Sequence, residues 1–119
     1  MQEKSKIFVA GHKGMVGSSL VRRLQYHGYM NIKGVNKSTL DLTNQKETRE
    51  YFEEEQFDYV FLAAAKVGGI IANSTYPAEF IYNNLQIQNN IIHSSYLTNV
   101  KKLLFLVSSC IYPKMAPQP

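Results

Sequence analysis

The sequence contains a single cysteine among its 119 residues. One cysteine cannot form an internal disulfide, which is consistent with a reducing cytoplasm. No apolar run approaches the roughly 20 residues that a bilayer-spanning helix requires. The N-terminal stretch "MQEKSKIFVAG" contains no apolar segment of signal-peptide length. We therefore expect a cytoplasmic protein that does not enter a membrane.

Neither charge sign dominates the composition. The formal net charge is +4, and the lysines and arginines are scattered rather than clustered. This distribution argues against a nucleic-acid interface, although scattered basic groups can still serve an anionic small ligand. No group of cysteine, histidine and acidic residues in the sequence has the spacing of metal ligands, so we expect no metal site. The acidic cluster in "QKETREYFEEEQF" is interpreted as a solvated helix face.

Short β-like runs alternate with longer amphipathic segments, which is typical of a parallel sheet covered by helices. Five runs are predicted to be strands, over residues 6–10, 31–36, 39–42, 58–65 and 103–107. Right-handed crossovers would place these strands in the spatial order 3-2-1-4-5. The predicted fold class is α/β, a doubly wound parallel sheet of the Rossmann type.

Three helices are predicted between the strands. The first has an apolar face of Val16, Leu20, Val21 and Leu24 and ends near Gly28, a suitable C-terminal glycine. The second covers "QKETREYFEEEQF" after the capping residues Thr43 and Asn44. The third runs from Tyr76 to Asn99 and presents on one face the residues Ile81, Leu85, Ile92 and Tyr96.

A glycine-rich loop joins the first strand to the first helix. Gly11, Gly14 and Gly17 have the spacing G-x-x-G-x-x-G, which in this context is typical of dinucleotide binding. The first glycine permits a tight turn, the second lets a pyrophosphate approach the backbone, and the third allows close helix packing. A P-loop is excluded because G-x-x-x-x-G-K-[ST] does not occur. A methyltransferase loop for S-adenosylmethionine and a merely glycine-rich turn remain alternatives.

The residues after the second strand favour NADP over NAD. An NAD site places a carboxylate there to accept the ribose 2′-hydroxyl, whereas a 2′-phosphate requires a cation. Lys37 occupies this neighbourhood, and the nearest acid, Asp41, comes later. Lys13, inside the glycine loop, is predicted to reach the same phosphate. Either lysine alone has a simpler interpretation as a solvated surface charge.

The last predicted strand leads into "SSCIYP", which holds the only cysteine. Taken alone, Ser108 and Cys110 are either reacting groups or the polar end of a buried strand. The glycine loop, "LAAAKVGGI" and "SSCIYP" together resemble the extended short-chain dehydrogenase/reductases of the NAD-dependent epimerase/dehydratase family. The run "FLAAAKVGGIIANSTYPAEFIYNNLQIQNNIIHSSY" is especially similar to the GDP-L-fucose synthase branch. The resemblance covers essentially the whole chain.

The resemblance implies an activity on a GDP-sugar substrate. Enzymes of this branch epimerise GDP-4-keto-6-deoxy-D-mannose at C3 and C5 and reduce its C4 ketone with NADPH. Ser108 matches the catalytic serine, and Cys110 matches an acid/base of epimerisation. Lys13 and Lys37 would meet the 2′-phosphate, and the full-length enzyme would form a homodimer. The implied cofactor contacts are Gly11, His12, Lys13, Gly14, Met15, Val16, Gly17, Lys37, Asp41, Leu42, Ala63, Ala64, Ala65 and Asn84.

The sequence departs from this family in one respect. The family's Tyr-x-x-x-Lys pair has no suitable match, because Tyr29 and Lys33 have the spacing but fall between the first helix and the second strand. We therefore expect residues 1–119 to be the N-terminal part of an NADP-binding Rossmann domain, with the sheet incomplete at its C-terminal side. The substrate domain would be absent and the chain alone inactive. A non-catalytic dinucleotide-binding module is the alternative.

Overall fold

The described residues form one sheet of four parallel strands in the order β2-β1-β3-β4. The computed structural model describes residues 1–64, 74–107 and 113–117. The strand bounds are β1 Ile7–Ala10, β2 Ile32–Lys33, β3 Tyr59–Leu62 and β4 Lys102–Phe105. The α/β Rossmann-type fold is thereby confirmed, and β4 lies at one end of the described sheet.

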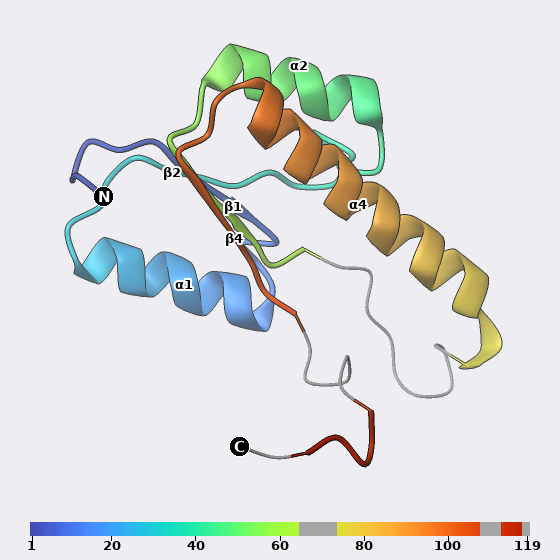
Figure 1. Cartoon of the computed structure of the whole chain (residues 1–119). Coiled ribbons are helices and arrows are strands. Elements are labelled where there is room, and N and C mark those ends of the chain that lie inside the picture. The colour runs from blue at the N-terminus through green and yellow to red at the C-terminus, as the bar shows by residue number, and fades with distance from the viewer. Residues whose placement is uncertain (65–73, 108–112, 118–119) are drawn as a thin grey trace.

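Helices cover both faces of the sheet (Figure 1). Helix α1 lies on one face, and helices α2 and α4 lie together on the other (Figure 1). The helix bounds are α1 Met15–Tyr26, α2 Gln45–Glu55 and α4 Pro77–Leu97. Two expected boundary signals are confirmed: Asn44 caps α2 by accepting from the Glu47 amide, and Gly28 follows α1 with a positive φ of 88°. No helix in the described residues is long and apolar enough to cross a membrane.

The core has two layers because β1 is buried on both faces. Ile7 and Val9 pack toward α1, whereas Phe8 and Ala10 pack toward α2 and α4. Phe8 stands at the centre of an aromatic cluster that stabilises the second layer. Its ring stacks on Phe57 at 4.9 Å between centroids and meets Phe52 edge-on at 5.4 Å. Both arrangements are favourable for aromatic pairs.

Two strand predictions need correction. The predicted strand over residues 39–42 does not form, and the second strand covers only Ile32 and Lys33 instead of residues 31–36. Local hydrogen bonds explain the first error. The carbonyl of Asn36 accepts from the amides of Thr39 and Leu40 at 3.0 and 2.9 Å. These bonds close a turn, which competes with the extended backbone that a strand requires.

The apolar face of α4 is exposed rather than buried. Ile81, Leu85, Ile92 and Tyr96 do share a face, but they are 61%, 46%, 43% and 77% exposed. The helix instead buries one isoleucine and three polar residues against its neighbours. These buried residues are Asn90, Ile91, Ser94 and Ser95. Small side chains allow α4 to approach α2 closely, so the apolar stripe is left facing outward.

Replacing Phe52 with alanine should destabilise the domain strongly. Phe52 is fully buried and contacts Phe8 and Phe57. We expect Phe52→Ala to lower the free energy of unfolding by about 3 kcal/mol, because truncation leaves a cavity in the core. Urea unfolding monitored by circular dichroism measures the change. Tyr26→Ala, at a side chain that is 79% exposed, is the control and should change stability little. Equal effects of the two substitutions would contradict this description of the core.

Candidate functional site

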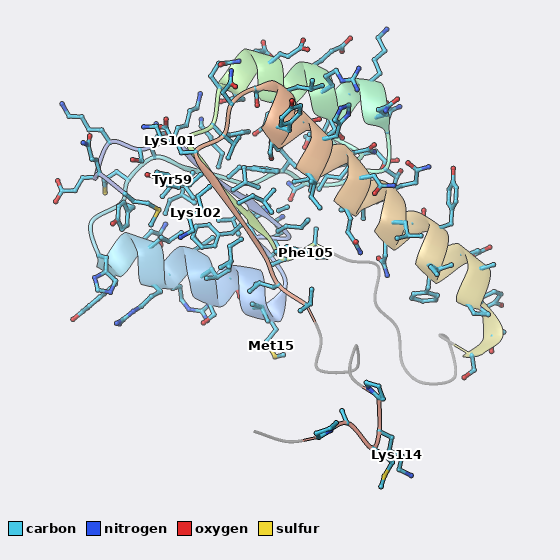
Figure 2. The ribbon with its side chains drawn as sticks, in the orientation of Figure 1. Met15, Tyr59, Lys101, Lys102, Phe105 and Lys114 are labelled. Atoms are coloured by element: carbon cyan, nitrogen blue, oxygen red, sulfur yellow. The ribbon has the colours of Figure 1, made fainter. Side chains whose placement is uncertain are left out.

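A cleft of about 580 Å³ lies at the carboxyl ends of the strands. Figure 2 shows Met15 of α1 and Phe105 of β4 at this end of the molecule, and Tyr59, Lys101 and Lys102 at the opposite end. Ligands in open α/β sheets bind at this edge. The cleft is lined by Gly11, Gly14, Met15, Val16, Gly17, Val35, Lys37, Leu40, Asp41, Leu42, Thr43, Ala63, Ala64, Asn83 and Ile87.

The glycine turn forms the floor of the cleft. Gly11 has a φ of +83°, and a Cβ there would lie 2.8 Å from the carbonyl oxygen of Ala63. The amide of Gly14 donates to the carbonyl of Gly11 at 3.0 Å and closes the turn. A Cβ on Gly17 would overlap the carbonyl oxygen of Gly11 and lie 2.6 Å from its carbonyl carbon. Side chains at Gly11 and Gly17 are therefore excluded by close backbone packing.

The N-terminus of α1 opens into this cleft. Helix α1 begins at Met15 after the extended residue Gly14, which provides no side-chain cap, and its first turn contains no acidic residue. The first N–H groups of a helix have no partner within the helix and carry the positive end of its dipole. This end of α1 is therefore suited to binding an anionic group such as phosphate.

The second wall of the cleft is the segment after β2, and it carries charge. The Asp41 carboxylate Oδ1 accepts from the amide of Thr43 at 3.0 Å and from its hydroxyl at 2.7 Å. These hydrogen bonds, with a smaller contribution from the charge of Lys37, hold the pKa of Asp41 below its usual value. Asp41 is thus ionised at neutral pH and is engaged within its own turn. Lys37 lines the same cleft and supplies a cation.

Helix α4 and the end of β3 form the third wall. Ala63 and Ala64 follow β3 directly, and Asn83 and Ile87 project from α4. The two alanines leave room beside the glycine turn. The cleft thus combines a helix N-terminus, the cation of Lys37, the carboxylate of Asp41 and apolar side chains. This combination suits a ligand that carries phosphates and a flat apolar ring.

Most of the predicted cofactor residues meet in the cleft. Of the described residues that were predicted, His12, Lys13 and Asn84 do not line it. The His12 ring instead lies close to the backbone of Gly34, where an added Cβ would be 2.7 Å from the ring atom Cδ2. Lys13 is exposed. The predicted residues Ala65, Ser108 and Cys110 lie outside the described residues.

Sequence reasoning missed five lining residues, namely Val35, Leu40, Thr43, Asn83 and Ile87. Val35 and Leu40 flank Lys37 and were assigned to strand interiors. Asn83 and Ile87 are one helical turn apart, on the side of α4 opposite Ile81. That spacing places both on one face of α4, but only the packing of the helix turns this face toward the cleft. Within the described part of the chain, no group of three histidine, cysteine or acidic side chains is placed to hold a metal ion.

Comparisons with known proteins agree with this geometry. The chain is 62% identical over 120 residues to GDP-L-fucose synthase 1 of Arabidopsis thaliana. This match covers all of this chain and 37% of that protein. It is 51% identical over 116 residues to GDP-L-fucose synthase of Escherichia coli, covering 98% of this chain and 36% of the relative. The chain thus spans about a third of the length of these relatives.

A solved structure is similar over the whole chain. The GDP-D-glycero-L-gluco-heptose synthase of Campylobacter jejuni, determined in the presence of NADPH, matches with a TM-score of 0.94 and 49% identity. The match covers all of this chain and 35% of that structure. The model of the NAD dependent epimerase/dehydratase family matches residues 7–119. The chain belongs to the NAD dependent epimerase/dehydratase family.

Proposed function

We propose that this chain binds NADPH in the cleft as the cofactor-binding part of an NADP-dependent epimerase/reductase. The observation that carries the proposal is the glycine turn, where close packing excludes a Cβ at Gly11 and Gly17. A backbone without side chains at the N-terminus of α1 lets a pyrophosphate reach the helix N–H groups. Bound NADPH would supply the hydride for a reduction. The role of the chain is to hold and orient the cofactor.

The charges in the cleft support NADPH over NADH. Lys37 lines the cleft, whereas the carboxylate of Asp41 is already engaged by Thr43. A 2′-phosphate would gain a cation at Lys37, and a second from Lys13 if its exposed side chain folds over the bound ligand. Both Thr43 bonds end on Oδ1, so a free 2′-hydroxyl would have Oδ2 of Asp41 as its acceptor, whereas a 2′-phosphate would be favoured by the cation of Lys37. Leu40, Leu42 and Ile87 offer apolar contact to the adenine ring.

We further propose that the longer protein acts on a GDP-sugar. The plant and bacterial relatives named GDP-L-fucose synthase support C3/C5 epimerisation and C4 reduction of GDP-4-keto-6-deoxy-D-mannose. Strand β4 ends at the carboxyl edge and leads toward Ser108 and Cys110, to which we assign the catalytic serine and the epimerisation acid/base. Residues 1–119 contain no suitably placed Tyr-x-x-x-Lys pair. The chain alone should therefore bind NADPH without turnover.

A GDP-heptose is the second candidate substrate. The observation in its favour is the 49% identity and TM-score of 0.94 with the GDP-heptose synthase of Campylobacter jejuni. Both candidates share the GDP group, so the cofactor cleft does not distinguish them. Assays of the longer protein with GDP-4-keto-6-deoxy-D-mannose and with a GDP-4-keto-heptose would distinguish the two candidates. Turnover of the heptose substrate alone would replace the fucose assignment.

We propose that a second copy of the chain covers the apolar face of α4. The positions of its four exposed residues are symmetric about the midpoint between residues 88 and 89. In an antiparallel pair of α4 helices, Ile81 would therefore meet Tyr96 of the second copy, and Leu85 would meet Ile92. A two-fold axis requires this self-complementarity. From Phe80 to Leu97 the helix also carries no aspartate, glutamate, lysine or arginine.

Lys37→Ala tests the cofactor assignment. We expect the Kd for NADPH to rise about tenfold, because a hydrogen bond between charged groups contributes roughly 1.5 kcal/mol or more. The Kd for NADH should not change, because NADH has no 2′-phosphate. Fluorescence titration of the reduced nicotinamide measures both constants. Lys46→Ala, on the exposed side of α2, is the matched control. Equal weakening of NADPH and NADH would refute the role of Lys37, and preferential binding of S-adenosylmethionine would refute the cofactor class.

Gly17→Ala tests the turn itself. The new methyl group would overlap the carbonyl of Gly11, so α1 must move away from the turn. We expect NADPH binding to fall below detection in the same titration. Far-UV circular dichroism establishes whether the variant is folded, and Ser19→Ala, at an exposed position of α1, is the control. A folded Gly17→Ala protein with wild-type affinity would show that the pyrophosphate does not bind at this turn.

Charge placed on the exposed face of α4 should separate the two copies. We expect Leu85→Asp combined with Ile92→Asp to convert a dimer into a monomer, because unpaired charges are costly in a buried interface. Sedimentation equilibrium over a range of protein concentrations measures the mass. Ser19→Asp adds one charge at an exposed position of α1, away from the α4 face, and is the control that should leave the mass unchanged. A wild-type chain that remains monomeric at the highest concentration would contradict the proposed pairing.

A further inference from the structure

The backbone carbonyl of Leu42 is held by a side chain of helix α4. The side-chain amide of Asn90, on α4, donates to it at 2.9 Å. The hydroxyl of Thr48, on α2, approaches the same oxygen at 3.4 Å and also donates to the carbonyl of Asn44 at 2.8 Å. Leu42 stands between Asp41 and Thr43, and all three line the cleft. One carbonyl thus ties a cleft wall to α4.

These contacts are shielded from water. Asn90 is 4% exposed and Thr48 is fully buried. A buried amide is costly to leave without a partner, so the donor of Asn90 holds its acceptor firmly. The two bonded residues are 48 positions apart in the sequence. The bond therefore fixes a distant segment and does not merely stabilise the helix that carries it.

The same side of α4 serves both the cleft and this bond. Asn83 and Ile87 line the cleft, and Asn90 follows Ile87 by three residues. Residues three and four apart share a helix face. Asn90 therefore fixes how far the wall at residues 41–43 lies from the cleft-lining side chains Asn83 and Ile87, because all three asparagine and isoleucine side chains belong to one face of α4. In Figure 1, α4 lies beside α2 on one face of the sheet, as this arrangement requires.

We propose that Asn90 is a positioning residue for the adenosine half of the cofactor site. Its amide holds the carbonyl of Leu42 and keeps the wall at Asp41, Leu42 and Thr43 at a fixed distance from α4. This inference rests on the proposed binding of NADPH in the cleft. Lys37 and Leu40 precede this wall in the chain, so loosening it disturbs the groups that meet adenine and the 2′-phosphate. The glycine turn, which belongs to β1 and α1, is unaffected.

The test compares two halves of the cofactor in Asn90→Ala. We expect the Kd for adenosine 2′,5′-bisphosphate to rise about fivefold, the effect of losing one ordering hydrogen bond. The Kd for reduced nicotinamide mononucleotide should stay the same. Isothermal titration calorimetry on the full chain measures both. Asn89→Ala, at the adjacent exposed position, is the matched control and should leave both constants unchanged.

A second measurement separates this inference from the proposed function. Amide hydrogen exchange at residues 41–44 should be faster in Asn90→Ala than in the wild type without any ligand. If the wild type binds neither NADPH nor its halves, the proposed function fails, and the role of Asn90 at the cofactor site fails with it even where exchange is faster. If the wild type binds the cofactor but Asn90→Ala changes neither the exchange rates nor the affinities, the inference about Asn90 is overturned and the proposed function stands. An equal loss for both cofactor halves also overturns it, since a purely structural role predicts that result. Asn90→Leu, which fills the same space without a donor, replaces Asn90→Ala if the latter does not fold.

Discussion

The site depends on one constraint, the burial of β1 on both faces. Because β3 runs beside β1, the chain leaving β1 must turn within contact distance of the backbone after β3. Gly11 makes this turn with a φ of +83°, where a Cβ would lie 2.8 Å from the carbonyl oxygen of Ala63. Helix α1 then starts at once, packed through Gly17 against the same turn. The helix N-terminus is thereby brought to the carboxyl edge of the sheet, which creates the floor of the cleft.

The opposite wall of the cleft is built by a different means. It has no ladder of strand hydrogen bonds, so local backbone turns and side-chain hydrogen bonds define its shape. Asp41 accepts hydrogen bonds from Thr43 within the turn, and Asn90 holds the carbonyl of Leu42 from α4. The pKa of Asp41 is lowered chiefly by Thr43, so this contribution to stability is present above the unfolded pKa of about 3.9 and is lost as the pH falls through the lower folded value. At neutral pH Asp41 is therefore ionised and its bonds to Thr43 are at full strength.

The sequence predicted the elements whose signals are local. Strands β1 and β3 are continuous apolar runs, the glycine spacing marks the turn, and Asn44 is a local cap for α2. The wrong strand prediction is explained by competition between local turn hydrogen bonds and the hydrogen bonds that would join a strand to the sheet. Residues 39–42 have strand-like composition, but the carbonyl of Asn36 closes a turn there. The contributions of Asn83 and Ile87 depend on how α4 packs against α2, which helical periodicity alone does not determine. A buried Asn90 paired with Leu42 likewise has no signal in either segment alone.

The central claim is that the cleft between the glycine turn and the segment at residues 40–43 binds NADPH. Backbone amide chemical shifts of the isotope-labelled chain, recorded during a titration with NADPH, test this most directly. The account predicts that the largest shift changes occur at residues 11–17, 40–43 and 63–64, and that they saturate together with a single Kd. Saturable changes confined to the outer face of α1 or to the exposed face of α4 would contradict it, as would the absence of any change at residues 11–17.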